Sequence, residues 1–369
     1  MKYIWQRENW TEFTWQSDLL LPSLGKARQL QGEVLARGKA LGIKFTDQAQ
    51  AEILTEEAVK TSAIEGEALN RDSVRSSVAK HLGLPQTGLR SVDRHVDGLV
   101  EILIDATKNY NRPLTVKRLH EWHAALFPTG YSGLQKIRVG KWRNKPMQVV
   151  SGPMERHVVH FEAPPSERID EEMHNLLVWF KTSQGVTEGL LRSAILHFWF
   201  VTIHPFDDGN GRVARALTDM ALAQDEKLPV RFYSLSSQIM EERQGYYDVL
   251  EKVSKGDRDI TPWLLWFLNC CSHAMEKSKT IIGKVLAKSE FWQKHSQTSL
   301  NDRQRKVINL LLDTGEGLFK GGLTTRKYVS VAKVSRATAY REITELVEKN
   351  LLRSLSGRGR SVAYDIVWP

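Results

Sequence analysis

The sequence predicts a mainly α-helical protein with one β-hairpin and a C-terminal winged helix-turn-helix domain. Long segments place apolar residues at helical spacing, as in 188–203. Two short β-rich runs, 147–151 and 158–161, flank Gly152-Pro153, which is typical of a hairpin. In the last fifth of the chain, short helical segments precede a basic turn at 357–360, the order found in a winged helix-turn-helix.

Helical patterns account for most of the chain. Near the N-terminus, Trp5, Trp10 and Trp15 are expected in the core or at a docking surface, because aromatic side chains bury large areas. Composition shifts to Ser, Gln, Lys and Asn near residue 290, which indicates a domain boundary. Helices are expected at 17–41, from Thr46 onward, at 70–82, 115–128, 167–181 and 188–203, after Gly211, at 263–271, at 303–312 and within 325–349.

Composition limits the class of protein. The 369 residues suggest two or three domains, and 41% hydrophobic with 26% charged residues exclude a disordered chain. No apolar run reaches the roughly 18 residues that a membrane span needs, and charges interrupt any signal-peptide core at the N-terminus. The two cysteines, Cys270 and Cys271, are adjacent and poorly placed for a bridge. We therefore expect a soluble cytoplasmic protein without a membrane partner.

Positive charge gathers at the C-terminus. The net charge is +9, and residues 301–369 hold 13 Lys/Arg against 7 Asp/Glu. A basic terminal module suggests an anionic partner such as nucleic acid. A solubilising surface explains the same balance.

The segment richest in chemistry is a loop between two predicted helices. After the apolar helix 188–203, the chain breaks at His204-Pro205 and continues through glycines to a new helix. The first N–H groups of a helix lack internal partners and, with the helix dipole, form an anion site. Gly209 and Gly211 let the backbone approach a phosphate closely.

Charged side chains complete this predicted anion site. Arg212 and Arg215 lie three apart on one helix face, so both guanidiniums can reach one polyanion. Asp208 is a hard oxygen ligand suited to Mg²⁺ beside substrate phosphates. His204 can accept a proton near neutral pH. The residues alone therefore predict a site for triphosphate transfer.

The run from His204 to Arg215 resembles the signature of Fic-domain proteins, His-x-Phe-x-Asp/Glu-Gly-Asn-Gly-Arg-x-x-Arg. The resemblance implies a Fic-type helical core that transfers AMP from ATP to a Ser, Thr or Tyr hydroxyl of a target protein, and to itself. It implies His204 as the general base, Phe206 as a loop anchor and Asp208 as the Mg²⁺ ligand. Nucleotide contacts are implied for Asp208, Gly209, Asn210, Gly211, Arg212, Val213, Ala214 and Arg215, with the two arginines on the β- and γ-phosphates.

A second motif lies upstream. Thr61-Ser62-Ala63-Ile64-Glu65-Gly66 resembles the Fic inhibitory pattern Ser/Thr-x-x-x-Glu-Gly/Asn, although alone it also fits an ordinary helix end. The resemblance implies that Glu65 pairs with Arg215 and blocks the γ-phosphate. It also implies that Glu65 can position water for removal of AMP. The opening, Tyr3 to Trp15, is similar to the start of a bacterial Fic subgroup.

The predicted hairpin fits the family's flap, to which a target segment can add by backbone hydrogen bonds. It is otherwise a plain structural hairpin. By resemblance, Val159, His160, Phe161 and Glu162 lie near nucleotide or target, and Tyr246, Tyr247 and Leu250 line the adenine pocket. Tyr246 and Tyr247 also fit a core role, and His197 is expected to be structural.

Three domains are predicted: an N-terminal helical region with the inhibitory helix (1–95), the Fic core (96–290) and the winged helix-turn-helix domain (291–369). In the last, Ser335 to Arg341 resembles a recognition helix, and Arg358 and Arg360 a wing. DNA binding, protein docking and dimerisation remain open for it. We predict an autoinhibited, ATP- and Mg²⁺-dependent protein adenylyltransferase. Alternatives are AMP removal, another nucleotide donor, or a nucleotide-sensing DNA-binding regulator.

Overall fold

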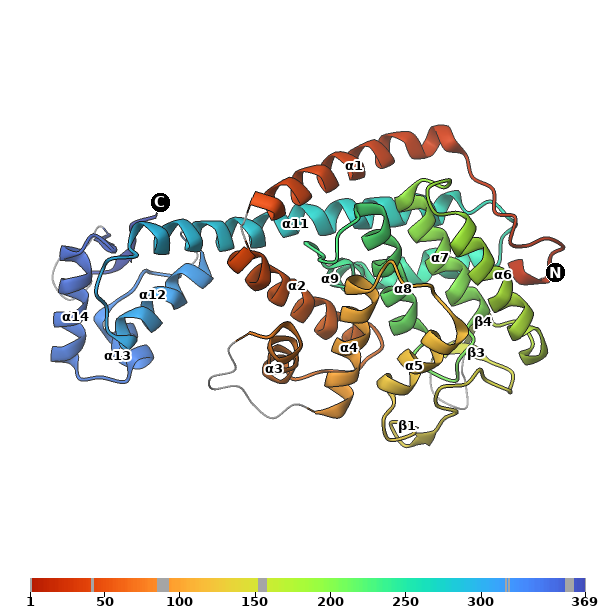
Figure 1. Ribbon diagram of the computed structural model, residues 1–369, viewed down its shortest axis with the longest axis horizontal. Helices are drawn as coiled ribbons and strands as arrows, with labels where there is room; N and C mark the ends of the chain where they lie inside the picture. The colour runs from red at the N-terminus through yellow and green to blue at the C-terminus, as the bar shows by residue number, and fades with distance from the viewer. Residues whose placement is uncertain are drawn as a thin grey trace. The chain divides into compact units, whose positions relative to one another are not determined.

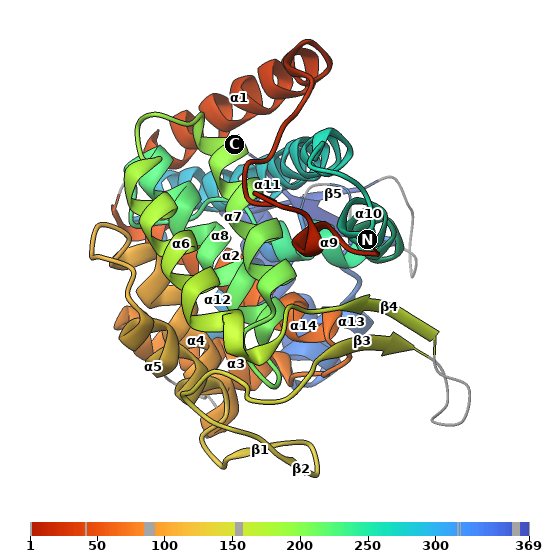
Figure 2. The same cartoon turned by 90° about the vertical axis from the view of Figure 1, so that its right-hand side faces the viewer.

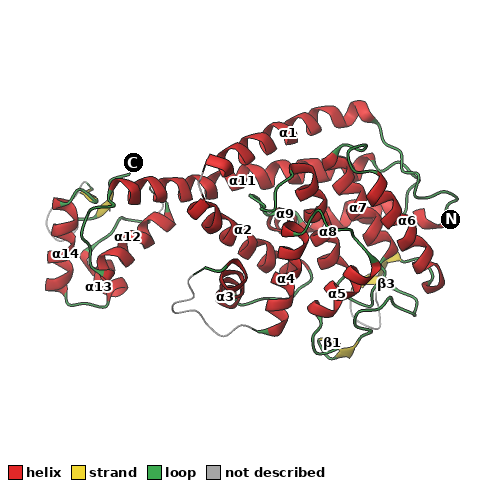
Figure 3. Cartoon of the chain, viewed as in Figure 1, coloured by secondary structure: helices red, strands yellow, loops and turns green. Residues whose placement is uncertain are grey.

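The structure is a computed structural model that describes residues 2–40, 43–84, 93–151, 158–315, 317, 319–355 and 362–368 (Figure 1). Its described part is mainly helical with small antiparallel hairpins, as Figure 3 shows. The α-helices are α1 Ser17–Ala40, α2 Ile43–Ile64, α3 Arg71–Leu82, α4 Arg94–Lys108, α5 Val116–Leu126, α6 Ile169–Thr182, α7 Gly189–Ile203, α8 Asn210–Glu226, α9 Leu235–Glu241, α10 Arg243–Ser254, α11 Thr261–Lys294, α12 Asp302–Thr314, α13 Thr325–Ala332 and α14 Arg336–Glu348. The other elements are the 3-10 helices η1 Ile4–Gln6 and η3 Ser166–Arg168 and the strands β1 Tyr131–Ser132, β2 Gln135–Lys136, β3 Gln148–Ser151, β4 Val158–Glu162, β5 Leu352–Ser354 and β6 Tyr364–Ile366.

The chain forms two compact units. One comprises Met1–Ala36 with Gln50–Ser278, and the other Arg37–Ala49 with Lys279–Pro369. The predicted domain boundaries at 95 and 290 remain predictions. None of the helices in the described ranges combines the length and the apolar composition that a membrane-spanning segment needs.

The centre of the larger unit is the pair α7 and α8, which pack against each other. α7 is buried on nearly all sides because it is almost wholly apolar. Its predicted structural histidine, His197, is fully buried and joins the Thr218 hydroxyl at 2.9 Å and the Tyr246 hydroxyl at 2.8 Å. Burial lowers the pKa of His197 to about 3, so its ring is neutral. Tyr246 is thus a core residue.

Several predicted helices keep their predicted ends. Asn70 caps α3, its side chain accepting from the Ser73 amide, and Gly83 ends it in the left-handed region. The apolar run 263–271 is only the first part of α11, which continues to Lys294. Beyond Cys271 that helix alternates polar and apolar residues, so a single apolar run underestimates its length.

The predicted hairpin at 147–161 is present as β3 and β4, with Val149 opposite Phe161 and a register shift after Val149. Its predicted turn, Gly152-Pro153, lies outside the described residues. A second hairpin, β1–β2, was not predicted, because two-residue strands carry no periodicity. Figure 2 shows both hairpins as extensions of the helical body. The N-terminal segment supports β4: Tyr3 packs on Phe161 with ring centres 5.3 Å apart, and the Trp5 indole donates to the Glu162 carbonyl at 2.7 Å.

The smaller unit contains α12, α13, α14 and the antiparallel pair β5–β6 around its own apolar cluster. The buried Glu342 carboxylate on α14 accepts from the Tyr328 hydroxyl at 2.7 Å and from Asn301 at 3.1 Å, and pairs with Arg303 at 2.5 Å. These bonds tie the three helices together. The predicted wing residues Arg358 and Arg360 lie outside the described residues.

Candidate active site

The loop between α7 and α8 has a fixed shape. His204 ends α7 in the left-handed region, with φ at +52°. Phe206 is fully buried and stacks on the His123 ring at 4.1 Å. The Asn210 side chain closes the turn, because its amide oxygen accepts from the Phe206 amide at 2.9 Å and its nitrogen donates to the Phe206 carbonyl at 2.8 Å. The predicted anchor Phe206 is thus held from both sides.

Two glycines at the start of α8 let neighbouring side chains approach the backbone closely. Gly209 has φ at +77°, and a Cβ there would lie 2.8 Å from the Phe127 ring. A Cβ on Gly211 would lie 2.1 Å from a Glu65 carboxylate oxygen. An anionic group therefore already rests directly on the backbone at the N-terminus of this helix, where the helix dipole favours negative charge.

Arg215 lies buried under that carboxylate. It is 2% exposed, and its guanidinium donates to Glu65 at 2.7 Å, to the Thr61 hydroxyl at 2.6 Å and to the Thr61 carbonyl at 2.9 Å. Burial opposes the charge, but the Glu65 carboxylate holds the pKa of Arg215 above its usual value. Its Nη1 is buried and has no hydrogen-bond partner among the described residues. The site therefore keeps a spare N–H donor.

Arg212 lies one turn earlier and is also mostly buried. Its Nη1 donates to a carboxylate oxygen of Glu67 at 3.0 Å, and its Nη2 lies 3.8 Å from Asp208. Its guanidinium stacks over the Phe127 ring with 4.9 Å to the ring centre. The buried Nε, like Nη1 of Arg215, lacks a partner within the described ranges. The pair Glu67–Arg212 has no counterpart in the sequence prediction.

The end of α2 brings both glutamates to this place. Gly66 has φ at +85°, so the chain turns back immediately after Glu65. From α10, Arg243 donates to the Ile64 carbonyl at 2.9 Å and the Tyr247 hydroxyl does so at 3.3 Å. The predicted adenine-pocket residue Tyr247 therefore lies against the end of the predicted inhibitory motif. Leu250 is half-buried one turn further along α10.

His204 is half-buried at the loop entrance. Its Nδ1 lies 3.2 Å from the Val201 carbonyl, which fixes the proton on Nδ1 and leaves Nε2 as the acceptor. Burial lowers the pKa of the imidazole below its usual value, and the charge of Arg143 lowers it further. The ring is therefore neutral near pH 7, as a proton acceptor must be.

Asp208 lies between His204 and Arg212 in the sequence. One carboxylate oxygen accepts from the Gly209 amide at 2.5 Å, and the other accepts from the Ser132 hydroxyl on β1. The side chain is 41% exposed. Carboxylate and hydroxyl oxygens are ligands that Mg²⁺ accepts beside phosphate. No group of three His, Cys, Asp or Glu residues in the described part of the chain could hold a metal by itself.

The predicted flap residues point in different directions. Phe161 is buried with Tyr3 and Ala163. The His160 ring lies 2.6 Å from the Glu251 carboxylate on α10. Val159 and Glu162 are half-buried, and Glu162 uses its carbonyl to hold Trp5. The contacts of Phe161 and Glu162 thus serve the N-terminal segment, while His160 joins the flap to α10.

Sequence reasoning missed Arg143, which is 2% exposed. Its Nε donates to the His204 carbonyl at 2.8 Å, its Nη2 to the Pro164 carbonyl at 2.6 Å and its Nη1 to the Lys145 carbonyl at 2.8 Å. This side chain links the base, the exit of β4 and the segment before β3. An isolated arginine in a polar stretch gives no pattern to find.

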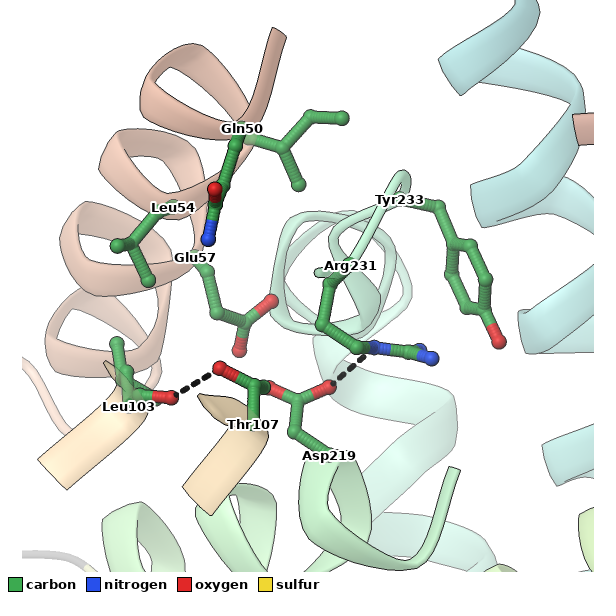
Figure 4. Close-up of a pocket in the computed structure, with 9 residues that line it drawn as sticks. Gln50, Leu54, Glu57, Leu103, Thr107, Asp219, Arg231 and Tyr233 are labelled. Atoms are coloured by element: carbon green, nitrogen blue, oxygen red, sulfur yellow. Dashed lines mark hydrogen bonds and ion pairs between the residues drawn. The ribbon is translucent and has the colours of Figure 1, made fainter. Parts of the chain in front are cut away.

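Glu57 on α2 was also missed. Its carboxylate accepts from the Ser234 hydroxyl at 2.8 Å, the Ser236 amide at 3.0 Å and the Ser236 hydroxyl. Figure 4 shows it facing Arg231 and Asp219 across a cavity of about 20 Å³, room for one water. Burial, and then the Glu57 charge, raise the pKa of Asp219. Glu57 anchors the helix that carries Glu65, two turns away.

Comparison with known proteins finds family matches for two parts of this chain. Residues 113–222 match the Fic/DOC family, and residues 3–84 match a domain of unknown function, DUF4172. A probable protein adenylyltransferase of Aquifex aeolicus is 32% identical over 99 residues, which are 26% of this chain and 31% of that protein. The protein adenylyltransferase Fic of Aedes aegypti is 23% identical over 62% of this chain and 42% of its own length. The chain thus spans less than half of either relative.

Two solved structures share the fold. A Fic family protein from Desulfovibrio desulfuricans G20 superposes with a TM-score of 0.54 at 20% identity, covering 94% of this chain and 96% of that one. A Fic domain containing signaling protein from Bacteroides thetaiotaomicron gives 0.52 at 18% identity, over 70% of this chain and 98% of its own. At these identities the likeness concerns the fold alone.

Proposed function

We propose that this chain, whose residues 113–222 are a Fic/DOC-family domain related at low identity to protein adenylyltransferases, transfers AMP from ATP to a hydroxyl side chain of a target protein. One observation carries the proposal. Two buried arginines with spare N–H donors lie at the N-terminus of α8, beside a neutral histidine. That arrangement suits a polyphosphate next to a proton acceptor.

The nucleotide would lie on the backbone from Gly209 to Gly211. Arg212 would contact the β-phosphate and Arg215 the γ-phosphate, with their unpartnered Nε and Nη1 as additional donors. Val213 and Ala214 are fully buried and support the helix from the core side. Tyr247 and Leu250 are proposed beside the adenine, because α10 approaches the end of α2.

The proposed reaction is an in-line displacement. Nε2 of His204 takes the proton from the target hydroxyl, whose oxygen attacks the α-phosphorus while pyrophosphate leaves. Asp208 and the Ser132 hydroxyl would hold Mg²⁺, which neutralises phosphate charge when bound. Arg143 keeps the His204 backbone in place during the proton transfer. The β3–β4 flap would register the target segment, and Val150 and Val158 are exposed on it.

Glu65 would hold this enzyme in a low-activity state. Its carboxylate already occupies the Arg215 guanidinium, so the γ-phosphate and Glu65 compete for one cation. The same carboxylate lies over Gly211, where it could activate a water against an AMP-modified side chain. Removal of AMP is therefore the second candidate activity of this site.

The test is transfer of label from α-³²P-ATP with Mg²⁺ to the protein itself. Wild type, Glu65→Gly and Glu65→Gly with His204→Ala are run together. We expect label to rise in the single variant and to vanish in the double variant. Nucleotide binding without label in any lane would contradict AMP transfer. Loss of AMP from a modified acceptor in wild type alone would instead favour removal.

We also propose that the smaller unit binds DNA through α14. Arg336, Tyr340 and Arg341 are exposed there, and Tyr340 is 64% exposed. Arginine and tyrosine are residues that contact phosphates and bases. Fluorescence anisotropy with a labelled duplex should show weaker binding for Arg336→Gln than for the control Lys306→Gln on α12, with affinity falling as salt rises. Equal loss in both variants would contradict the assignment.

A further inference from the structure

The predicted inhibitory pattern ends at Gly66, but a second carboxylate follows it. The left-handed turn at Gly66 reverses the chain, and Glu67 accepts Nη1 of Arg212 at 3.0 Å while Glu65 accepts Nη2 of Arg215 at 2.7 Å. Two acids that are two residues apart thus meet two arginines that are one helical turn apart. Each arginine of the site is paired with its own carboxylate.

The two pairs differ in exposure. The Arg215 side chain is 1% exposed and that of Glu65 is 31% exposed, while the values are 10% for Arg212 and 45% for Glu67. The Glu67 pair is therefore better screened by solvent and weaker. Both nevertheless place a negative charge within hydrogen-bonding distance of a guanidinium that a phosphate would need. A phosphate at either position would have to compete with that carboxylate for the guanidinium.

We propose that Glu65 and Glu67 together determine how many phosphates the site accepts. This inference rests on the proposed function, in which Arg212 contacts the β-phosphate and Arg215 the γ-phosphate. Glu67 then opposes any nucleotide with a β-phosphate, and Glu65 opposes only a triphosphate. Neither carboxylate opposes the α-phosphate, so AMP can still bind at the start of α8. Glu67 is a specificity-determining residue, and the locked protein prefers AMP to ADP and ADP to ATP.

The two carboxylates make separable predictions. Glu67→Gln removes the charge but keeps the size, so affinity for ADP and ATP should rise about fivefold while affinity for AMP stays within about twofold. Glu65→Gln should raise affinity for ATP and leave ADP unchanged. The double variant should bind ATP tightest of all. The preference for fewer phosphates should disappear in it.

The experiment is calorimetric titration of AMP, ADP and ATP, with Mg²⁺, into wild type, the two single variants and the double variant. Glu56→Gln is the matched control, because Glu56 lies on the same helix, α2, pairs with Arg71 and loses the same charge. It should leave all three affinities as in wild type. Circular dichroism checks that each variant is folded.

Two results would overturn the inference: Glu67→Gln changes AMP and ADP affinity equally, or it changes neither. If Glu65→Gln nevertheless raises the affinity for ATP, the proposed nucleotide site stands but Glu67 has no role in it. If the expected order of affinities, AMP above ADP above ATP in wild type, is found but no label is transferred, the inference stands and the proposal of AMP transfer is wrong. If no adenine nucleotide binds to any variant, both are wrong.

Discussion

The Nε of Arg143 donates a hydrogen bond to the backbone oxygen of His204 at 2.8 Å. The backbone amide of Arg143 also donates to the Pro205 carbonyl at 2.8 Å. A buried cation therefore faces the C-terminal end of α7, where helix carbonyls point outward and the dipole is negative. The left-handed backbone of His204, unusual for a residue with a side chain, is held by these bonds.

Replacing Arg143 should destabilise the protein and displace the base. Arg143→Met leaves three carbonyls, at least one of them buried, without this donor, so we expect the free energy of unfolding to fall by about 3 kcal/mol. Arg143→Lys keeps the charge but not the planar set of donors, and should recover less than half of that loss. Urea unfolding measures both. A change below about 0.5 kcal/mol in Arg143→Met would contradict the role assigned to this side chain.

The rate of label transfer should fall at low pH and stay constant at high pH. Because burial lowers the pKa of His204, the ring stays neutral from pH 8 down past its usual value near 6.5. Label transfer by Glu65→Gly should therefore be flat above pH 7 and fall about tenfold per unit only below the lowered pKa. As a control, nucleotide binding is measured at each pH to show that it does not change with pH. A midpoint at or above 6.5 would argue against a buried neutral base.

The turn at Gly66 allows a test of inhibition by Glu65 that changes no charged residue. A Cβ there meets nothing within 4 Å, so Gly66→Ala adds only backbone strain at φ +85°, about 1 kcal/mol. That strain weakens the turn, and we expect self-labelling to rise about fivefold. Gly25→Ala is the control, since Gly25 lies within α1 and also has open space. It should leave labelling unchanged and stabilise its helix slightly.

Glu57 should matter only while Glu65 is present. Glu57→Gln weakens the attachment of α2 to Ser234 and Ser236, so the end of α2 should leave the arginines more often and self-labelling should rise. In a Glu65→Gly background the same change should add nothing, because no inhibitory carboxylate remains. Non-additivity in a double-mutant cycle is the measurement. Equal increases in both backgrounds would show that Glu57 acts on the chemistry directly.

The sequence predicted the helical class, the hairpin and the loop from His204 to Arg215, because each has a local signal. Apolar periodicity marks α7, and glycines mark the turn into α8. Contacts between distant segments have no such signal. Arg143 lies 61 residues from His204, and Glu57 lies 177 residues from Ser234.

Glu67 was missed for a different reason. It lies next to a motif that was found, but the motif pattern ends one residue earlier, at Gly66. Its partner Arg212 was assigned to phosphate alone. By resemblance Phe161 is predicted near nucleotide or target; its ring packs on Tyr3 in this structure, and the predicted role stays a prediction. The predicted roles of individual site residues remain predictions until nucleotide binding is measured.

Cys270 and Cys271 are both fully buried, and burial raises the pKa of each thiol. Thiol reagents act on exposed thiolates, so the natural cysteines should be inert toward maleimides at neutral pH. A fluorophore could therefore be attached selectively to a new cysteine at the exposed Ala68, just beyond Glu67, without altering the native pair. Movement of the end of α2 could then be followed in real time as nucleotide arrives.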